Sequence, residues 1–240
     1  MIVEVCANSL ESALNAQEAG ADRIELCSEL GVGGVTPSLG LIRLVTEKLH
    51  IPVHVLVRPR SAHFTYTEWE FQVMLKDIEA CRANGAAGIV SGVLHPDATV
   101  NVSRTQALVN ASGPLHFTFH RAFDWVPDPV VALEALEGIG VQTILSSGQK
   151  PSAAQGAPLL GELQRRAKSC VLMAGGGVNP DNATMFLEAG LSAIHLSGTA
   201  FGHALPMDGK LSMNSQKHLA EHQVAVTQTE TIRQVVKHVK

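Results

Sequence analysis

The sequence predicts an α/β protein that folds as a single-domain (β/α)8 barrel, the TIM-barrel architecture. A short apolar strand followed by a helix recurs eight times along the chain. The 240 residues match the roughly 250 that one such barrel needs, and 45% of them are hydrophobic, which suffices for a full core. Polar residues alternate with apolar ones along several strands, as expected where one strand face lines the barrel interior. We therefore expect one domain over residues 1–240.

The eight strands are identified from short segments rich in valine, isoleucine and leucine. They begin near Ile2, Asp22, Val53, Gly88, Leu115, Thr143, Cys170 and Ala193. Successive side chains of a strand point to opposite sides of the sheet. In the fifth segment, LHFTFHR, the leucine and the two phenylalanines therefore face the helices, while His116, Thr118 and His120 point into the barrel.

Local signals mark where the helices end and begin. Four of the strands follow a glycine that supplies the C-terminal turn of a helix, namely Gly20, Gly85, Gly140 and Gly190. A capping box of Thr67 with Glu70 begins one helix. The Asp-Pro pair at 128–129 and the Asn-Pro pair at 179–180 each place a proline at the first helical position. The loops from strand to helix consequently share one face of the barrel.

The C-terminal part of the chain predicts one more helix after a long connection. Apolar residues at helical spacing indicate an amphipathic helix over about 227–240, formed by Ile232, Val235, Val236 and Val239. The stretch from Thr199 to Gln228 is longer than most connections. The sequence leaves open whether this stretch is a lid, a contact between subunits or partly disordered.

Composition excludes several classes of function. The net charge is −4 and no run of lysine and arginine follows a phosphate backbone, so nucleic acid is not an expected partner. No signal peptide and no apolar stretch of about 18 residues is found, so we expect a cytoplasmic protein without a membrane partner. The four cysteines form no CxxC pair and indicate free thiols or metal ligands instead of disulfides.

Polar side chains occupy inward positions on several strands. The inward pairs are Glu4 with Cys6, Glu25 with Cys27, His54 with Arg58, and His195 with Ser197. A barrel interior usually holds valine, isoleucine and leucine. Because buried polar groups cost free energy unless they are paired, this grouping indicates a functional site inside the barrel.

Several segments together resemble the CutC family, which is named for copper homeostasis. They are EVCANSLESALNAQEAGADRIELCS, GGVTPSLG, IPVHVLVRPR, TFHRAFD, SSGQK, MAGGGV and IHLSG, within a core of about 2–215. The resemblance implies a cytoplasmic TIM barrel that binds or handles copper and forms a homo-oligomer, and the family's candidate copper-binding thiols match Cys6 and Cys27. Three departures are found: the family's RPRGGDF reads RPRSAHF over 58–64, TSG reads SSG, and an Arg-Asn pair after Met207 is missing. They lie mostly in the loops after the third and eighth strands.

Cys6 and Cys27 also suggest a metal site by their position. Both stand near the C-terminal ends of adjacent parallel strands, which lie about 4.8 Å apart, so two inward thiols can approach one ion. Thiolates favour Cu(I), and imidazole nitrogens of His54, His120 or His195 can add to them. The alternative is that both cysteines are small buried packing residues, as we expect of Cys81 and Cys170.

Glycine-rich loops after the last two strands suggest an anion site. The residues that can hold an anion through backbone N–H groups are Gly175, Gly176, Gly177, Ser197 and Gly198. Glycine permits close approach of the backbone because it has no Cβ. Plain tight turns would use the same residues.

A second hypothesis is an enzyme that acts on a small phosphorylated or carboxylated metabolite. His120 and Glu25 would act as acid and base, because imidazole titrates near neutrality. Arg58 would hold the anion, and Glu4, Thr118, Arg121 and His195 would complete the binding site. His120 can instead be a satisfied core histidine, and either arginine can pair with Glu4 or Glu25.

Overall fold

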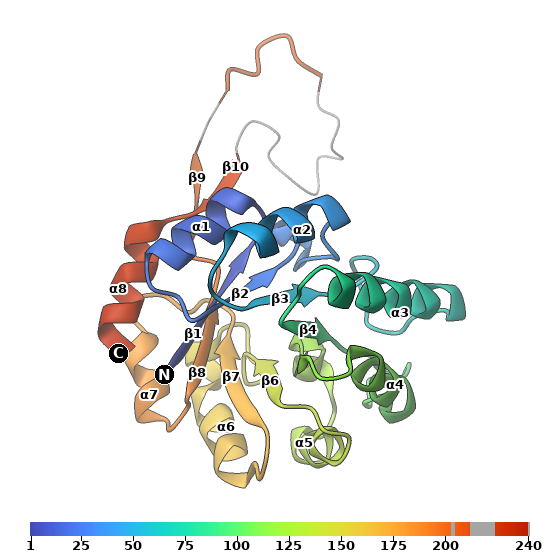
Figure 1. Ribbon diagram of the computed structural model, residues 1–240. Helices are drawn as coiled ribbons and strands as arrows, with labels where there is room; N and C mark the ends of the chain where they lie inside the picture. Colours follow the sequence, from blue (N-terminus) through green and yellow to red (C-terminus); the bar gives the residue numbers. More distant parts are fainter. Residues whose placement is uncertain (203–204, 212–223, 240) are drawn as a thin grey trace.

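The computed structural model describes residues 1–202, 205–211 and 224–239. Eight parallel strands form a closed barrel in sequence order, and the helices surround it (Figure 1). The strands are β1 (Ile2–Ala7), β2 (Arg23–Leu26), β3 (Val53–Leu56), β4 (Gly88–Ser91), β5 (His116–Phe119), β6 (Thr143–Ser146), β7 (Val171–Gly175) and β8 (Ala193–Leu196). This confirms the predicted (β/α)8 barrel.

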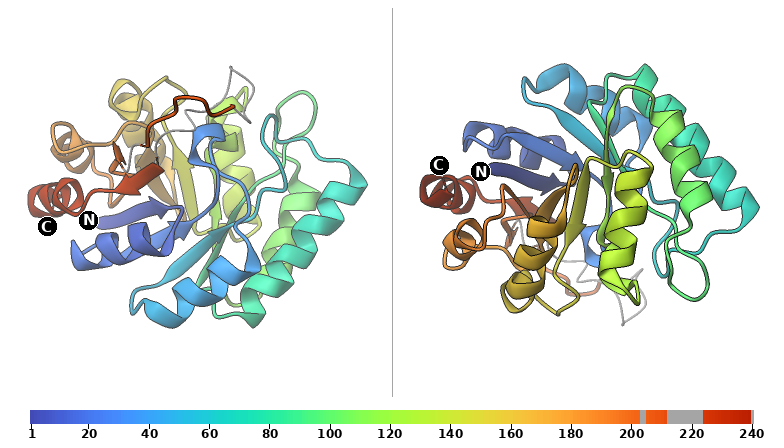
Figure 2. Two further views of the ribbon diagram at one scale, coloured as in Figure 1. Left: turned by 90° about the horizontal axis from the view of Figure 1, so that it is seen from above. Right: turned by 90° about the horizontal axis from the view of Figure 1, so that it is seen from below.

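The helices form the outer layer. They are α1 (Leu10–Glu18), α2 (Leu39–Lys48), α3 (Glu68–Ala83), α4 (Val102–Ser112), α5 (Pro129–Gly138), α6 (Ala153–Arg166), α7 (Ala183–Glu188) and α8 (Thr229–Val239), with 3-10 turns η1 (Leu30–Val32) and η2 (Arg121–Trp125). Among the described residues, no helix is long and apolar enough to cross a bilayer. The two views of Figure 2 show α8 in the ring between α1 and α7, near the N-terminus.

Most of the apolar core lies between the strands and the helices. Phe117, Phe119 and Ile144, on the outer face of β5 and β6, are fully buried there. Inside the barrel the apolar residues form two smaller groups, one around Leu56 and Val90 and the other around Leu145, Met173 and Ala193. Much of the remaining interior is polar.

The helix-end signals are confirmed with one exception. All four predicted glycines adopt a left-handed conformation, with φ between +82° and +89°. Thr67 and Glu70 form the capping box, and Pro129 begins α5. The prediction that Pro180 begins a helix is wrong, because α7 begins at Ala183. Side chains form a turn ahead of it instead: Asn179 donates its backbone N–H to the Asn182 amide, whose Nδ2 donates to the Gly177 carbonyl, both at 2.9 Å.

The segment before the last helix holds two strands that the sequence pattern did not predict. β9 (Thr199–Gly202) pairs antiparallel with β10 (Val224–Thr227). β10 is attached to the barrel at its end, where the Thr227 hydroxyl donates to the Ser197 carbonyl at 3.0 Å and the Thr227 N–H to the Ser12 hydroxyl at 3.2 Å. The rest of the expected long connection lies largely outside the described residues. The predicted amphipathic helix is confirmed as α8, with Ile232, Val235 and Val239 buried.

Candidate functional site

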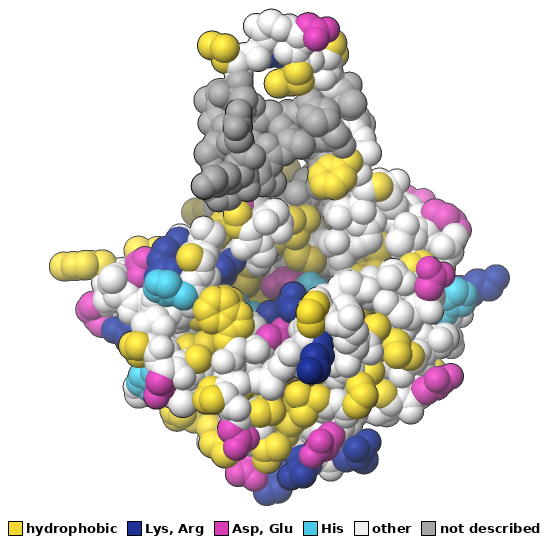
Figure 3. Space-filling view, turned by 180° about the vertical axis from the view of Figure 1, so that it is seen from behind, with side chains coloured by type: hydrophobic (Ala, Val, Ile, Leu, Met, Phe, Trp, Pro, Cys, Tyr) yellow, Lys and Arg dark blue, Asp and Glu magenta, His cyan; other side chains and the backbone are white. Residues whose placement is uncertain are grey.

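A cavity of about 280 Å³ opens at the C-terminal ends of the barrel strands. Its wall includes Cys6, Glu25, Cys27, Leu56, Arg58, Phe64, His120, Arg121, Gly176, Gly177, His195 and Ser197. On the face drawn in Figure 3, acidic, basic and histidine side chains gather in a hollow near the middle of the molecule. Residues predicted separately for the metal, anion and catalytic hypotheses therefore line one cavity.

The two predicted thiols lie side by side. Cys6 ends the inner face of β1 and Cys27 directly follows β2, and their Sγ atoms are 3.4 Å apart. The contact with Cys27 and burial raise the pKa of the Cys6 thiol well above its usual value. Cys81 and Cys170 are buried in the outer core instead, and the Cys170 thiol donates to the Val141 carbonyl at 2.8 Å, as expected of packing residues.

Glu4 is the centre of a buried charge network. Its carboxylate, which has no solvent exposure, accepts from Arg23 Nε at 2.5 Å and lies 2.8 Å from His195 Nδ1. Burial raises the pKa of Glu4, but the hydrogen bond from His195 and the charge of Arg23 outweigh it and hold the pKa well below its usual value. Glu4 therefore stays ionised inside the barrel.

Glu25 lies on the other side of the same imidazole. The distance from His195 Nε2 to the Glu25 carboxylate is 3.3 Å. Burial raises the pKa of Glu25 to about 7, against the opposing charge of His195. Burial lowers the pKa of His195, but Glu25 and Glu4 outweigh it, so the net shift is upward. Glu25 is therefore a carboxylate that exchanges a proton near neutral pH.

Arg23 is the functional residue that sequence reasoning missed. It begins β2 two residues before Glu25, so the alternation that places Glu25 inside also places Arg23 inside. Only 8% of Arg23 is exposed. The structure pairs Glu4 with Arg23, whereas the sequence had offered Arg58 or Arg121 as partners of the acids.

Arg58 and Arg121 have other partners than the expected ones. The Nη atoms of Arg58 donate to the carbonyls of Val32, Gly34 and Ala62 at 2.7–2.9 Å. The guanidinium thereby holds two loops together, and most of its donors are unavailable to an anion. Arg121 pairs with Asp124 at 2.8 Å and remains partly exposed at the cavity.

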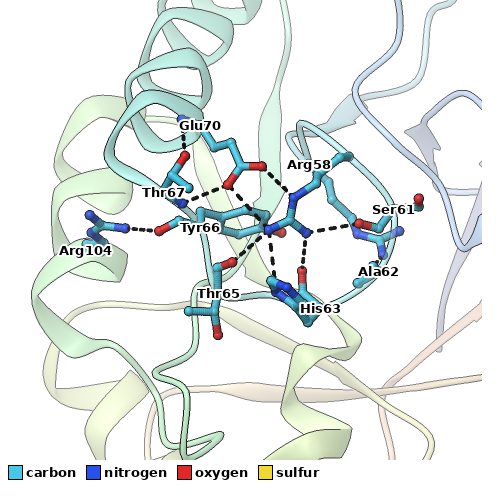
Figure 4. A network of polar contacts seen from close by, with 10 residues as sticks. Arg58, Ser61, Ala62, His63, Thr65, Tyr66, Thr67, Glu70 and Arg104 are labelled. Atoms are coloured by element: carbon cyan, nitrogen blue, oxygen red, sulfur yellow. Dashed lines mark hydrogen bonds and ion pairs between the residues drawn. The ribbon is translucent and has the colours of Figure 1, made fainter.

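The loop that contains the departure RPRSAHF is ordered by two arginines (Figure 4). Arg60 pairs with Glu70 at 2.5 Å and donates to the carbonyls of His63 and Thr65. Ala62 keeps a left-handed conformation, φ 72°, at a position where the family pattern has glycine. The left-handed conformation costs a non-glycine residue about 1–2 kcal/mol of free energy. Here the hydrogen bond that Arg58 donates to the Ala62 carbonyl holds Ala62 in that conformation.

His120 lines the cavity but does not titrate near neutrality. Burial, with the charge of Arg58, lowers its pKa to about 3. Its Nδ1 accepts from the Ala122 N–H at 3.3 Å, and its ring packs 4.8 Å from that of Phe64. The expectation of an imidazole that titrates near pH 7 is therefore wrong for His120, because an apolar, cationic environment keeps the ring neutral. A role for it in acid–base chemistry stays a prediction.

Two other inward residues of the prediction lie deeper in the barrel. Among the described residues, His54 is not part of the cavity wall. It stacks on His116 with 5.0 Å between ring centroids, and burial lowers the pKa of each to about 4. Thr118 is fully buried on the inner face of β5. These residues fill the interior below the cavity.

The predicted anion-binding glycines separate into two groups. Gly176 and Gly177 line the cavity with positive φ, and a Cβ on Gly176 would lie 3.4 Å from the Arg121 guanidinium. Gly175 instead makes room for other side chains, because a Cβ there would lie 2.5 Å from Leu145. Gly198 packs against α8, where a Cβ would lie 2.5 Å from Ile232. Packing thus accounts for two of the five predicted residues.

Comparison with known proteins places the chain in a family. A family model described as the CutC family matches residues 1–200. The chain belongs to the CutC family. The family model ends at the first residues of β9.

Relatives of known sequence and structure agree with this CutC membership. A Citrobacter koseri protein named family protein CutC is 43% identical over 224 residues, which are 92% of this chain and 90% of that protein. The Salmonella paratyphi B protein of that name is 47% identical over 196 residues, 82% of this chain and 79% of that protein. The crystal structure of a Streptococcus agalactiae protein, presented as a candidate copper homeostasis protein CutC, has a TM-score of 0.79 and 30% identity, and covers 82% of this chain and 98% of its own.

Proposed function

We propose that this CutC family protein binds Cu(I) through the thiols of Cys6 and Cys27 and handles copper in the cytoplasm. The observation that supports it is the 3.4 Å separation of the two sulfur atoms on the wall of a cavity. An ion placed between them contacts both sulfurs with little movement of either strand. The Streptococcus agalactiae relative, presented as a candidate copper homeostasis protein, agrees with this function.

The surroundings of the two thiols suit a soft, singly charged ion. Cys6 and Cys27 pack with Leu56 and Val90, both nearly free of solvent exposure. Thiolate sulfur favours Cu(I) over hard cations. An apolar shell also restricts the access of water to the site. The proposal therefore includes these two apolar side chains as the support of the site.

An anaerobic Cu(I) competition titration against a calibrated chelator tests the proposal. We expect the wild type to hold copper stoichiometrically, and Cys6→Ser, Cys27→Ser and the double variant to lose it. Cys81→Ser is the matched control, because it removes a buried thiol of the outer core. Equal binding by the wild type, both single variants and the double variant would overturn the proposal.

A second candidate function is an enzyme that acts on a small phosphorylated or carboxylated metabolite. It is favoured by Glu25, with a pKa of about 7, facing the same cavity as Arg121, Gly176, Gly177 and Ser197. Protection of the protein by inorganic phosphate against thermal unfolding tests this candidate. Arg121→Gln should abolish the protection, whereas Arg43→Gln on the exposed face of α2 should not.

The assembly of the chain into a homo-oligomer is likewise a proposal. The family resemblance implies it, and light scattering of the purified protein measures it directly. A monomer mass at micromolar concentration would contradict it.

A further inference from the structure

We propose that Cys6, Glu25 and His195 form a site for a divalent transition-metal ion, with Zn²⁺ as the best fit. One ligand atom from each residue lies within 4.8 Å of the other two. The three residues come from β1, β2 and β8, which are neighbours in the barrel, and Cys6 is directly paired with Glu25 in the register of β1 with β2. The site shares Cys6 with the proposed copper site and uses different donors beside it.

The orientation of His195 matches that of a metal ligand. Its Nδ1 lies 2.8 Å from the Glu4 carboxylate, which leaves Nε2 directed toward Glu25 at 3.3 Å. Metal-binding histidines commonly donate their other ring N–H to a carboxylate in this manner. Bond lengths of 2.0–2.3 Å around a tetrahedral zinc ion separate its N, O and S ligands by about 3.3–3.8 Å. The distance from His195 to Glu25 already lies in that range.

The charges of the site favour a divalent ion over a monovalent one. A Cys6 thiolate and a Glu25 carboxylate supply two negative charges, and His195 coordinates as a neutral imidazole. Glu4 adds no excess charge, because Arg23 is paired with it at 2.5 Å. A divalent ion therefore makes this set of three donors neutral overall, which suits a medium of low dielectric constant.

Mixed sulfur, nitrogen and oxygen ligands are characteristic of zinc. In zinc sites that bind a water or a substrate, the protein supplies three ligands and the fourth coordination position is open to a cavity. Cys6, Glu25 and His195 all line the cavity, so the fourth position would face it. Cys27 does not belong to this group of three described residues, which separates the site from the thiol pair.

Titrations of one set of variants with two metals test the inference. Zn²⁺ affinity is measured by chelator competition, and Co²⁺ is used as an optical probe because its thiolate complexes absorb in the near ultraviolet. We expect Glu25→Gln and His195→Gln to weaken Zn²⁺ binding by more than the about 10–100-fold that is typical of the loss of an outer-shell partner. Cys6→Ser should abolish the thiolate absorption of Co²⁺. Cys170→Ser removes a thiol of the outer core and should change neither the Zn²⁺ affinity nor the Co²⁺ absorption.

Cys27→Ser separates this inference from the proposed copper function. It should lose Cu(I) and keep the Co²⁺ absorption, whereas His195→Gln should keep Cu(I) and lose the absorption. If the wild type neither competes for Zn²⁺ nor develops the thiolate band, the divalent site is refuted, whatever the Cu(I) result. Equal weakening of Zn²⁺ binding by Cys27→Ser and His195→Gln also refutes it. If circular dichroism shows that His195→Gln does not fold, the Zn²⁺ affinity of Glu25→Gln decides between the outcomes.

Discussion

Replacing Glu4 with glutamine tests how much the buried charge network stabilises the barrel. The substitution keeps the size of the side chain and removes its charge. Arg23, of which only 8% is exposed, then loses its ion pair, and His195 loses the carboxylate at its Nδ1. The positive charge of Arg23 is left in the interior without its partner, whereas His195 still faces the Glu25 carboxylate at 3.3 Å.

The magnitude follows from the burial of the pair. Removing one partner of a buried ion pair typically costs about 3–5 kcal/mol, because the other charge stays buried and unpaired. Two charge-assisted hydrogen bonds at about 1.5–3 kcal/mol each give a similar figure. Since the pKa of Glu4 in the folded protein lies below its usual value of 4.5, this contribution is present above pH 4.5 and is lost as the pH falls further.

Urea unfolding at pH 7.5 measures the change in the free energy of unfolding. Glu70→Gln is the matched control: the Arg60–Glu70 distance is also 2.5 Å, but the two side chains are 31% and 25% exposed. Glutamine can retain the bond of the capping box, so we expect the control to lose at most about 1 kcal/mol. Equal destabilisation by Glu4→Gln and Glu70→Gln would refute the reasoning that burial gives the Glu4 pair its strength.

Three further predictions follow from particular contacts. Between pH 6.5 and 4.5 the histidine of the unfolded chain takes up a proton that the folded His120, with a pKa of about 3, does not bind, so the wild type should lose about 2 kcal/mol more stability than His120→Asn. Equal losses of stability by the two proteins in urea unfolding would contradict this. Gly198→Ala should lower the melting temperature, because the added Cβ clashes with Ile232. Adding Ile232→Val should restore part of the lost melting temperature, and no restoration would contradict the packing role of Gly198. Thr67→Ala should cost about 1 kcal/mol in chemical unfolding through loss of the α3 cap, and no measurable change would argue against the capping box.

Local sequence patterns predicted the architecture because each βα unit repeats the same signals. The glycines at the helix ends and the alternation along the strands are properties of a few neighbouring residues. They were sufficient to place Cys6 and Cys27 on the inner face of adjacent strands. The strands β9 and β10 escaped prediction, because a two-stranded pair carries little apolar pattern of its own.

The character of individual polar residues required the tertiary environment. The sequence assigned His120 an ordinary imidazole pKa, and the structure lowers that pKa to about 3 through burial and the nearby Arg58. It gives Glu25, in contrast, a pKa of about 7. Neither shift is encoded by spacing along the chain, because each depends on the charges and apolar groups that other strands bring to it.

By itself, then, the sequence determined eight alternating units, an inward polar face and a pair of neighbouring thiols. Only the tertiary structure decided which acid pairs with which base. Glu4 and His195 are 191 residues apart and meet because β8 closes the barrel against β1. The register of that closure is set by the tilt and stagger of all eight strands together, so no local segment of the sequence contains it.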